Sequence, residues 1–126
     1  MPDLDALADW TVKYIDTHLS ATLSVKEISA ELKLDPGDVE RAFRRVMGMT
    51  IKRYIGRRLM ERVDYLLASG ERSGYEIGIE LGFSSDRAFY RWVKRVYDVS
   101  FRKLKSEKYL SSSKSQGGEA PRSTSK

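Results

Sequence analysis

Residues 24–54 read SVKEISAELKLDPGDVERAFRRVMGMTIKRY, and residues 73–104 read SGYEIGIELGFSSDRAFYRWVKRVYDVSFRKL. The second stretch repeats the first at an offset of 49 positions, as from Ser24 to Ser73, and at 50 positions after one inserted residue, as from Arg41 to Arg91. The residues of the first stretch that recur unchanged are Ser24, Glu27, Ile28, Glu31, Leu32, Arg41, Arg45 and Val46. Identities at helical spacing with a single insertion predict that one supersecondary unit is used twice.

Each copy is predicted to be a helix-turn-helix module. Both begin with the pattern S-x-x-E, starting at Ser24 and Ser73, which is typical of a capping box at a helix start. Asp35 and Pro36 suit the start of the second helix in the first module, and Gly82 supplies the sharp exit from the first helix of the second module. The second helix of each module, here named the reading helix, is expected at residues 36–47 and 85–96. Its apolar residues recur at helical intervals as Val39, Phe43 and Val46, and as Phe89, Val93 and Val96.

A long amphipathic segment without an internal proline, residues 50–69, lies between the modules. Its apolar stripe consists of Ile51, Ile55, Leu59, Val63 and either Leu66 or Leu67. At about 1.5 Å per residue the segment would form a helix about 30 Å long, close to the roughly 34 Å between successive major grooves on one face of B-DNA. The fold class predicted is therefore all-α, with two helix-turn-helix subdomains joined by a long linker helix and about seven helices in total.

Four segments are expected along the 126 residues. Residues 1–49 hold an N-terminal helix, with an apolar pattern from Leu4 to Leu19, and the first module. Residues 50–69 form the linker helix, which Gly70 is placed to end. Residues 70–110 hold the second module and a last short helix marked by apolar residues at 101, 104 and 109. Residues 111–126 are rich in serine, glycine and charge, and are expected to be disordered.

The net charge of +5 is unevenly distributed. Acids outnumber bases in residues 1–40, whereas residues 41–60 contain only basic charges. The cations that follow the start of each reading helix are Arg41, Arg44, Arg45, Lys52, Arg53, Arg57 and Arg58, then Arg87, Arg91, Lys94, Arg95, Arg102, Lys103, Lys105 and Lys108. A single basic run is more often a solvated helix face, but two runs at equivalent positions of a repeat favour contact with phosphates.

The composition argues against several other classes of protein. The chain has no cysteine and a single histidine, His18, so neither a thiolate nor a zinc site is expected, and no cofactor is predicted. His18 follows the first amphipathic helix, where a structural role or a helix-end cation is expected. No catalytic constellation appears, and we expect no enzyme. No segment resembles a membrane span or a secretory signal, which favours a cytoplasmic, nucleoid-associated protein.

The chain also resembles a known family. Residues 14–70, YIDTHLSATLSVKEISAELKLDPGDVERAFRRVMGMTIKRYIGRRLMERVDYLLASG, and 76–100, EIGIELGFSSDRAFYRWVKRVYDVS, resemble the DNA-binding region of the AraC/XylS family of bacterial transcription regulators. The resemblance spans residues 8–109, and the length is closest to the small single-domain activators of the MarA/SoxS type. It implies a monomer that inserts one reading helix from each module into adjacent major grooves of an asymmetric promoter site and contacts RNA polymerase. Asp98 stands where the family usually has glycine, and Phe101 where it has proline.

The resemblance also suggests which residues of the first reading helix face DNA. In its first turns these are Gly37, Asp38, Glu40, Arg41 and Arg44. Arg41 is the best candidate for base contact because a guanidinium can span O6 and N7 of guanine, while Glu40 could accept a hydrogen bond from a cytosine amino group. The two acids also repel phosphate, and an equally good interpretation is that they favour the helix N-terminus. Gly37 suggests that this module reads few bases.

The second reading helix is expected to carry more of the specificity. Its outer side presents Asp86, Arg87, Tyr90, Arg91 and Lys94. Arg87 and Arg91 lie one turn apart and could meet successive bases, whereas Tyr90 could touch a thymine methyl group or a phosphate. Lys94, Arg95 and, in the first module, Arg45 suit phosphates. Trp92 and Trp10 are expected to pack in the interior.

Three functions therefore remain open from the sequence. The leading one is a self-contained, sequence-specific regulator of transcription, an activator by resemblance, that binds double-stranded DNA through both modules. The second is the DNA-binding portion of a longer, effector-sensing regulator, against which Met1 and the polar tail argue. The third is a helical protein that binds RNA polymerase or another regulator and has only weak affinity for DNA.

Overall fold

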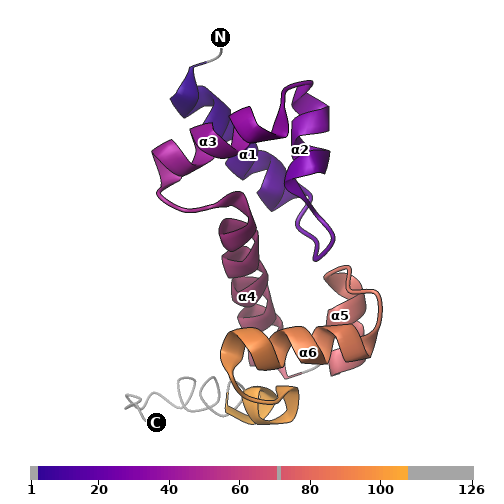
Figure 1. The fold of residues 1–126 in the computed structure, drawn as a ribbon. Helices are drawn as coiled ribbons and strands as arrows, with labels where there is room; N and C mark the ends of the chain where they lie inside the picture. The colour runs from indigo at the N-terminus through magenta and orange to yellow at the C-terminus, as the bar shows by residue number, and fades with distance from the viewer. Residues whose placement is uncertain (1–2, 71, 108–126) are drawn as a thin grey trace. The chain divides into compact units, whose positions relative to one another are not determined.

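The computed structural model describes residues 3–70 and 72–107 (Figure 1). Within these ranges the chain is helical and contains no strand. The helices are α1 (Leu4–Thr17), α2 (Val25–Leu32), α3 (Pro36–Met47), α4 (Ile51–Ser69), α5 (Gly74–Glu80) and α6 (Asp86–Tyr97). Residues 101–107 are helical as well. Two compact units, residues 1–60 and 61–126, divide the chain, so that α4 contributes to both.

The helices begin at the side chains that the sequence suggests. In the second module Ser73 and Glu76 form both halves of a capping box, because each side chain accepts a hydrogen bond from the backbone amide of the other residue. In the first module the structure shows the serine half, in which Ser24 Oγ accepts from the Glu27 amide. Asp35 accepts from the Gly37 amide, and Pro36 occupies the first position of α3. The sequence-based prediction of where α3 begins and ends is confirmed.

Several of the helices end at residues in the left-handed backbone region, which favours glycine. Gly48 ends α3 with φ of 74°, and Asp98 ends α6 with φ of 63°. These residues are 50 positions apart and therefore equivalent in the repeat. Because aspartate tolerates this conformation better than most residues with a Cβ atom, the helix end keeps its geometry without glycine. Gly70 follows the end of α4 with φ of 71°, as predicted.

In unit 1, α1 and α2 pack against α3, and the start of α4 adds the buried side chains Ile51, Ile55 and Leu59. The fully buried side chains include Ile15 of α1, Ile28 of α2 and Phe43 of α3. The Phe43 ring meets the edge of Tyr54 on α4, with 5.6 Å between the ring centroids. On the surface, Asp16 of α1 accepts a hydrogen bond of 2.8 Å from Nε of Arg58 on α4. These contacts fix α3 to the rest of unit 1.

In unit 2, α5 packs closely against α6. A Cβ atom added to Gly78 of α5 would lie 3.1 Å from Cβ of Phe89 on α6, so this approach leaves little room for a side chain. Phe83, Phe89 and Trp92 form an aromatic cluster in this core, with ring centroids 5.2 to 6.2 Å apart. Trp92 is buried at 8% exposure, which confirms its predicted packing role.

Some apolar positions differ from the sequence-based expectation. Val46 lies on the predicted apolar stripe of α3 but is 40% exposed, because the burial in that helix is confined to Val39, Ala42 and Phe43. The first helix ends at Thr17, before Leu19. The expected contribution of residue 109 and the expected disorder of residues 111–126 lie outside the described residues.

Candidate nucleic-acid interface

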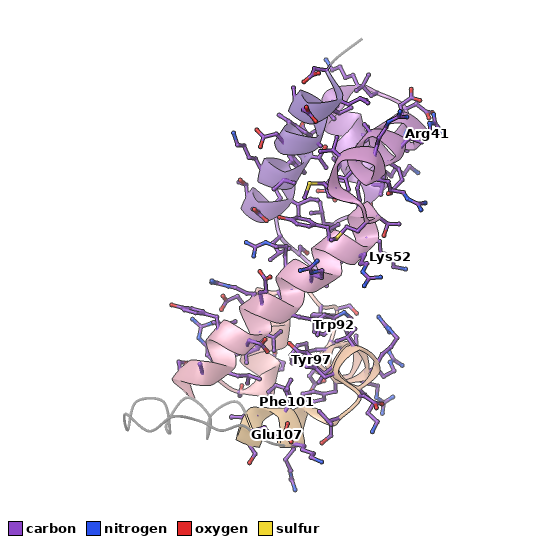
Figure 2. The ribbon with its side chains drawn as sticks, turned by 90° about the vertical axis from the view of Figure 1, so that its left-hand side faces the viewer. Arg41, Lys52, Trp92, Tyr97, Phe101 and Glu107 are labelled. Atoms are coloured by element: carbon purple, nitrogen blue, oxygen red, sulfur yellow. The ribbon has the colours of Figure 1, made fainter. Side chains whose placement is uncertain are left out.

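One side of α3 is buried and the other carries cations. Val39, Ala42 and Phe43 face the core, whereas Arg41, Arg44 and Arg45 are exposed. Figure 2 shows Arg41 on the outer side of the helix. Alternation of this kind follows from the helical repeat, in which residues three or four apart share a face. The first module therefore offers its basic side chains to a polyanion in solution.

The first turn of α3 combines a glycine with two carboxylates. Asp35 Oδ2 lies 2.9 Å from the amide nitrogen of Gly37 and caps the helix. Asp38 forms an ion pair with Arg41, one turn further along, with 2.5 Å between Oδ1 and Nη2. Both members of this pair are exposed. The candidate base-reading arginine of α3 thus already has an anionic partner within its own helix.

Glu40 makes a contact that sequence reasoning missed. Its Oε2 atom accepts a hydrogen bond of 3.1 Å from the backbone amide of Ile51, which lies 11 residues further along the chain. This amide belongs to the first turn of α4 and has no partner within that helix. Glu40, which is only partly exposed, therefore caps α4 and is not a free acceptor on the outer face of α3.

The second reading helix, α6, shows the same division into a buried and a basic side. Phe89, Trp92 and Val93 are buried. The charged residues predicted to face DNA, all of them exposed, are Asp86, Arg87, Arg91, Lys94 and Arg95. Within the described part of the chain, none of these four cations forms an ion pair with a carboxylate. Their charges are therefore available to an external anion.

Tyr90 has a second role that parallels the role of Glu40. Its ring centroid lies 5.4 Å from that of Phe101, the first residue of the helical run 101–107, and 38% of the residue remains exposed. Glu40 and Tyr90 are equivalent in the repeat, as are Ile51 and Phe101. In both modules this position of the reading helix thus holds the start of the next helix. The repeat offset of 50 is the signal that could have found the pairing.

Further cations lie at equivalent places beside the reading helices. Lys52 and Arg53 occupy the first turn of α4, and Arg102 and Lys103 occupy the first turn of the helical run 101–107, all of them exposed. Thr50 and Ser100 cap these two turns by accepting hydrogen bonds from the amides of Arg53 and Lys103. A helix N-terminus and nearby cations both favour anions. These four residues belong to the two basic runs of the sequence and extend the basic surface beyond the reading helices.

Three other observations concern metal binding, membranes and His18. Among the residues that the structure describes, no group of three or more His, Asp or Glu side chains could hold a metal ion. No helix in that part of the chain is both long and apolar enough to cross a bilayer. His18 lies at the end of α1, where its Nδ1 atom is 3.1 Å from the carbonyl oxygen of Tyr14.

Comparison with known proteins gives a family match and several relatives. Residues 28–107 match a family model described as a helix-turn-helix domain. The Msm operon regulatory protein of Streptococcus mutans is 32% identical over 95 residues, which are 75% of this chain and 34% of that protein. The regulatory protein SoxS of Salmonella typhimurium is 26% identical over 87 residues, which are 69% of this chain and 81% of that protein. The chain spans about a third of the length of the first relatives that it matches.

Solved structures share the fold at low sequence identity. The C-terminal domain of the response regulator AraT from Geobacillus stearothermophilus superposes with a TM-score of 0.73 and 18% identity, covering 98% of this chain and 95% of that one. A transcriptional regulator with an AraC-type DNA-binding domain from Chromobacterium violaceum gives a TM-score of 0.68 and 20% identity, covering 82% of this chain and 93% of that one. At these identities the similarity establishes the fold alone.

Proposed function

This chain belongs to the AraC family of DNA-binding helix-turn-helix transcription regulators, and we propose that it binds one asymmetric duplex site with both modules and activates transcription there. The family consists of regulators and not of enzymes. One observation carries the proposal, namely that α3 and α6 expose cations at the same three repeat positions. These pairs are Arg41 and Arg91, Arg44 and Lys94, and Arg45 and Arg95.

We assign base contacts to the arginines nearest the start of each reading helix. Arg87 and Arg91 of α6 lie one turn apart, and each can donate two hydrogen bonds to a guanine in the major groove. Arg41 has the equivalent position in α3. Gly37, Asp38 and Asp86 would line the same side of the two helices without donating a side-chain hydrogen bond to a base. This division gives α6 more of the specificity than α3.

We assign phosphate contacts to the cations that lie further along each reading helix. Arg44, Arg45, Lys94 and Arg95 would bind the backbone on either side of the groove. Lys52, Arg53, Arg102 and Lys103 would add contacts from the following helices. Glu40 and Tyr90 would act mainly by orienting those helices, although the exposed edge of Tyr90 still allows contact with a phosphate or a thymine methyl group.

We also propose a contact with RNA polymerase through α5. Tyr75 and Ile79 lie one turn apart on this helix and are 57% and 56% exposed. Their equivalents in the first module are Lys26 and Ala30, so the apolar surface is confined to the second copy. Exposed apolar side chains grouped on one face commonly mark a protein contact. Alanine at both positions should reduce activation in a reconstituted transcription assay and leave the DNA footprint unchanged.

The DNA-binding proposal is tested by selecting sites from a random duplex pool and footprinting the monomer on the selected site. We expect protection over about two helical turns, because each module would occupy one major groove.

Arg91→Ala should weaken binding to the selected site by about 1 to 3 kcal/mol and relax the preference at one base step. Lys94→Ala should weaken all duplexes alike and reduce the salt slope by about one unit. An unchanged ratio of selected to random binding in Arg91→Ala would refute the assignment of α6. Such a regulator would act as a monomer on the nucleoid in the cytoplasm.

A further inference from the structure

The two reading helices differ at the position three residues before their leading arginine. In α3 this position is Asp38, which forms an ion pair with Arg41. In α6 the equivalent residue is Ala88, and Arg91 has no carboxylate partner among the described residues. The repeat therefore provides an internal comparison between two equivalent arginines. Arg41 is paired with a carboxylate of its own helix, whereas Arg91 is not.

A second feature of α3, the glycine at position 37, leaves room for the Arg41 side chain to fold back toward the start of the helix. A Cβ atom added to Gly37 would lie 3.3 Å and 3.7 Å from the two terminal nitrogens of Arg41, and 2.9 Å from Oδ2 of Asp35. The guanidinium thus lies back along the first turn of the helix, over the residue that has no side chain. In α6 the residue equivalent to Gly37 is Arg87, whose bulk would fill that space. Gly37 and Asp38 together favour one orientation of Arg41.

We propose that Asp38 is a positioning residue that limits the contacts of Arg41 to sites where a base can compete with its carboxylate. A DNA phosphate, like the Asp38 carboxylate, is an anion that can pair with Arg41. The phosphate is also repelled by Asp38, so Arg41 adds little affinity for DNA of arbitrary sequence. A guanine offers two acceptors in the geometry of the guanidinium fork. The first module then contributes mainly at matched sites, whereas the unpaired cations of α6 also contact the phosphates of any duplex, in addition to the base contacts of Arg87 and Arg91. This inference rests on the proposed DNA-binding function.

The test measures the affinity of the full chain for a random duplex and for a duplex selected from a pool, at several salt concentrations. Asp38→Asn keeps the size of the side chain but removes its charge. It should raise the affinity for the random duplex about threefold to tenfold and steepen the salt slope by about one unit, because the released Arg41 gains a phosphate contact. The ratio of selected to random affinity should fall by a similar factor.

A double-mutant cycle with Arg41→Gln separates positioning from simple repulsion. If Asp38 acts through Arg41, Asp38→Asn should change the affinity for the random duplex by less than twofold when Arg41→Gln is present. Asp86→Asn is the matched control, because Asp86 is an exposed acid in the first turn of α6 without an arginine partner in the described chain. The change that Asp86→Asn makes in the affinity for the random duplex should be the same with or without Arg41→Gln.

Ala88→Asp provides the reciprocal experiment, since it places a carboxylate three residues before Arg91. It should lower the affinity for the random duplex and raise the ratio of selected to random binding relative to Ala88→Asn. An equal effect of Asp38→Asn in both Arg41 backgrounds would overturn the inference and leave only charge repulsion. If the unmodified chain bound neither duplex, the proposed function itself would fail, which is a distinct result.

Discussion

Gly56 lies in the interior of α4 without any structural need for glycine. A Cβ atom added there would meet no atom within 4 Å. Glycine within a helix is less favourable than alanine by roughly 0.5–1 kcal/mol, because the unfolded chain has more conformations to lose. Gly56→Ala should therefore raise the free energy of unfolding by about that amount in urea titrations. Gly78→Ala is the matched control and should lower it, because its Cβ would press on Phe89.

The phenol of Tyr97 makes stability depend on pH in the alkaline range. It donates a hydrogen bond of 3.0 Å to Oδ1 of Asp64 in unit 2. Burial, followed by the charge of Asp64 and this hydrogen bond, raises the pKa of Tyr97 far above its ordinary value. The unfolded chain therefore releases this proton near pH 10, where the folded chain still keeps it. The resulting stabilisation is complete below that pH and is lost as the pH rises above it.

Tyr97→Phe should remove this dependence. Between about pH 10 and 11, the free energy of unfolding of the unmodified chain should fall faster than that of the variant, by up to about 1.4 kcal/mol per pH unit. Tyr65→Phe is the control, since Tyr65 is 69% exposed. The assignment is wrong if both variants retain the full alkaline slope in denaturant titrations at fixed pH.

At the scale of the helices, the cap that α3 provides for α4 should contribute measurably to stability. Glu40→Ala removes the acceptor of the Ile51 amide and should lower the free energy of unfolding by about 0.5–2 kcal/mol, as for the loss of a helix cap. Glu40→Gln retains an oxygen in the same place and should keep most of that energy. Equal losses in the two variants, measured by thermal and urea unfolding, would show that the hydrogen bond itself does not stabilise the fold.

The helices could be predicted from the sequence because their signals are local. Caps such as Asp35 and Ser73 act on residues two or three positions away, and the apolar stripe of α4 follows the helical period. The role of Glu40 could not be predicted in this way, since its partner is 11 residues distant and becomes a neighbour only through packing. The same holds for Tyr90 and Phe101. The sequence pattern likewise placed both Arg41 and Arg91 on the outer sides of their helices. It did not reveal that Arg41 forms an ion pair with Asp38 whereas Arg91 has no carboxylate partner among the described residues.

At the scale of the whole molecule, joint binding by two modules should depend on the length of α4. Two alanines inserted between Met60 and Glu61 would turn the following part of the helix by about 200°. We expect the affinity for the full selected site to fall about tenfold or more, towards that of a single module, while each half of the site retains weak binding. Footprinting and titration of both duplexes measure this effect. Unchanged affinity for the full site would mean that the modules do not act as a spaced pair.

Because α4 runs unbroken across the boundary between the two units, it serves as the last helix of one and the first helix of the other. Ile51, Ile55 and Leu59 are buried in its first half, and Val63, Leu66 and Leu67 in its second half. A cut at any point within it would strip apolar side chains from a core and leave a short, marginal helical stub on each fragment. A gene fusion or truncation that aims to separate the two repeats must therefore duplicate this helix instead of dividing it.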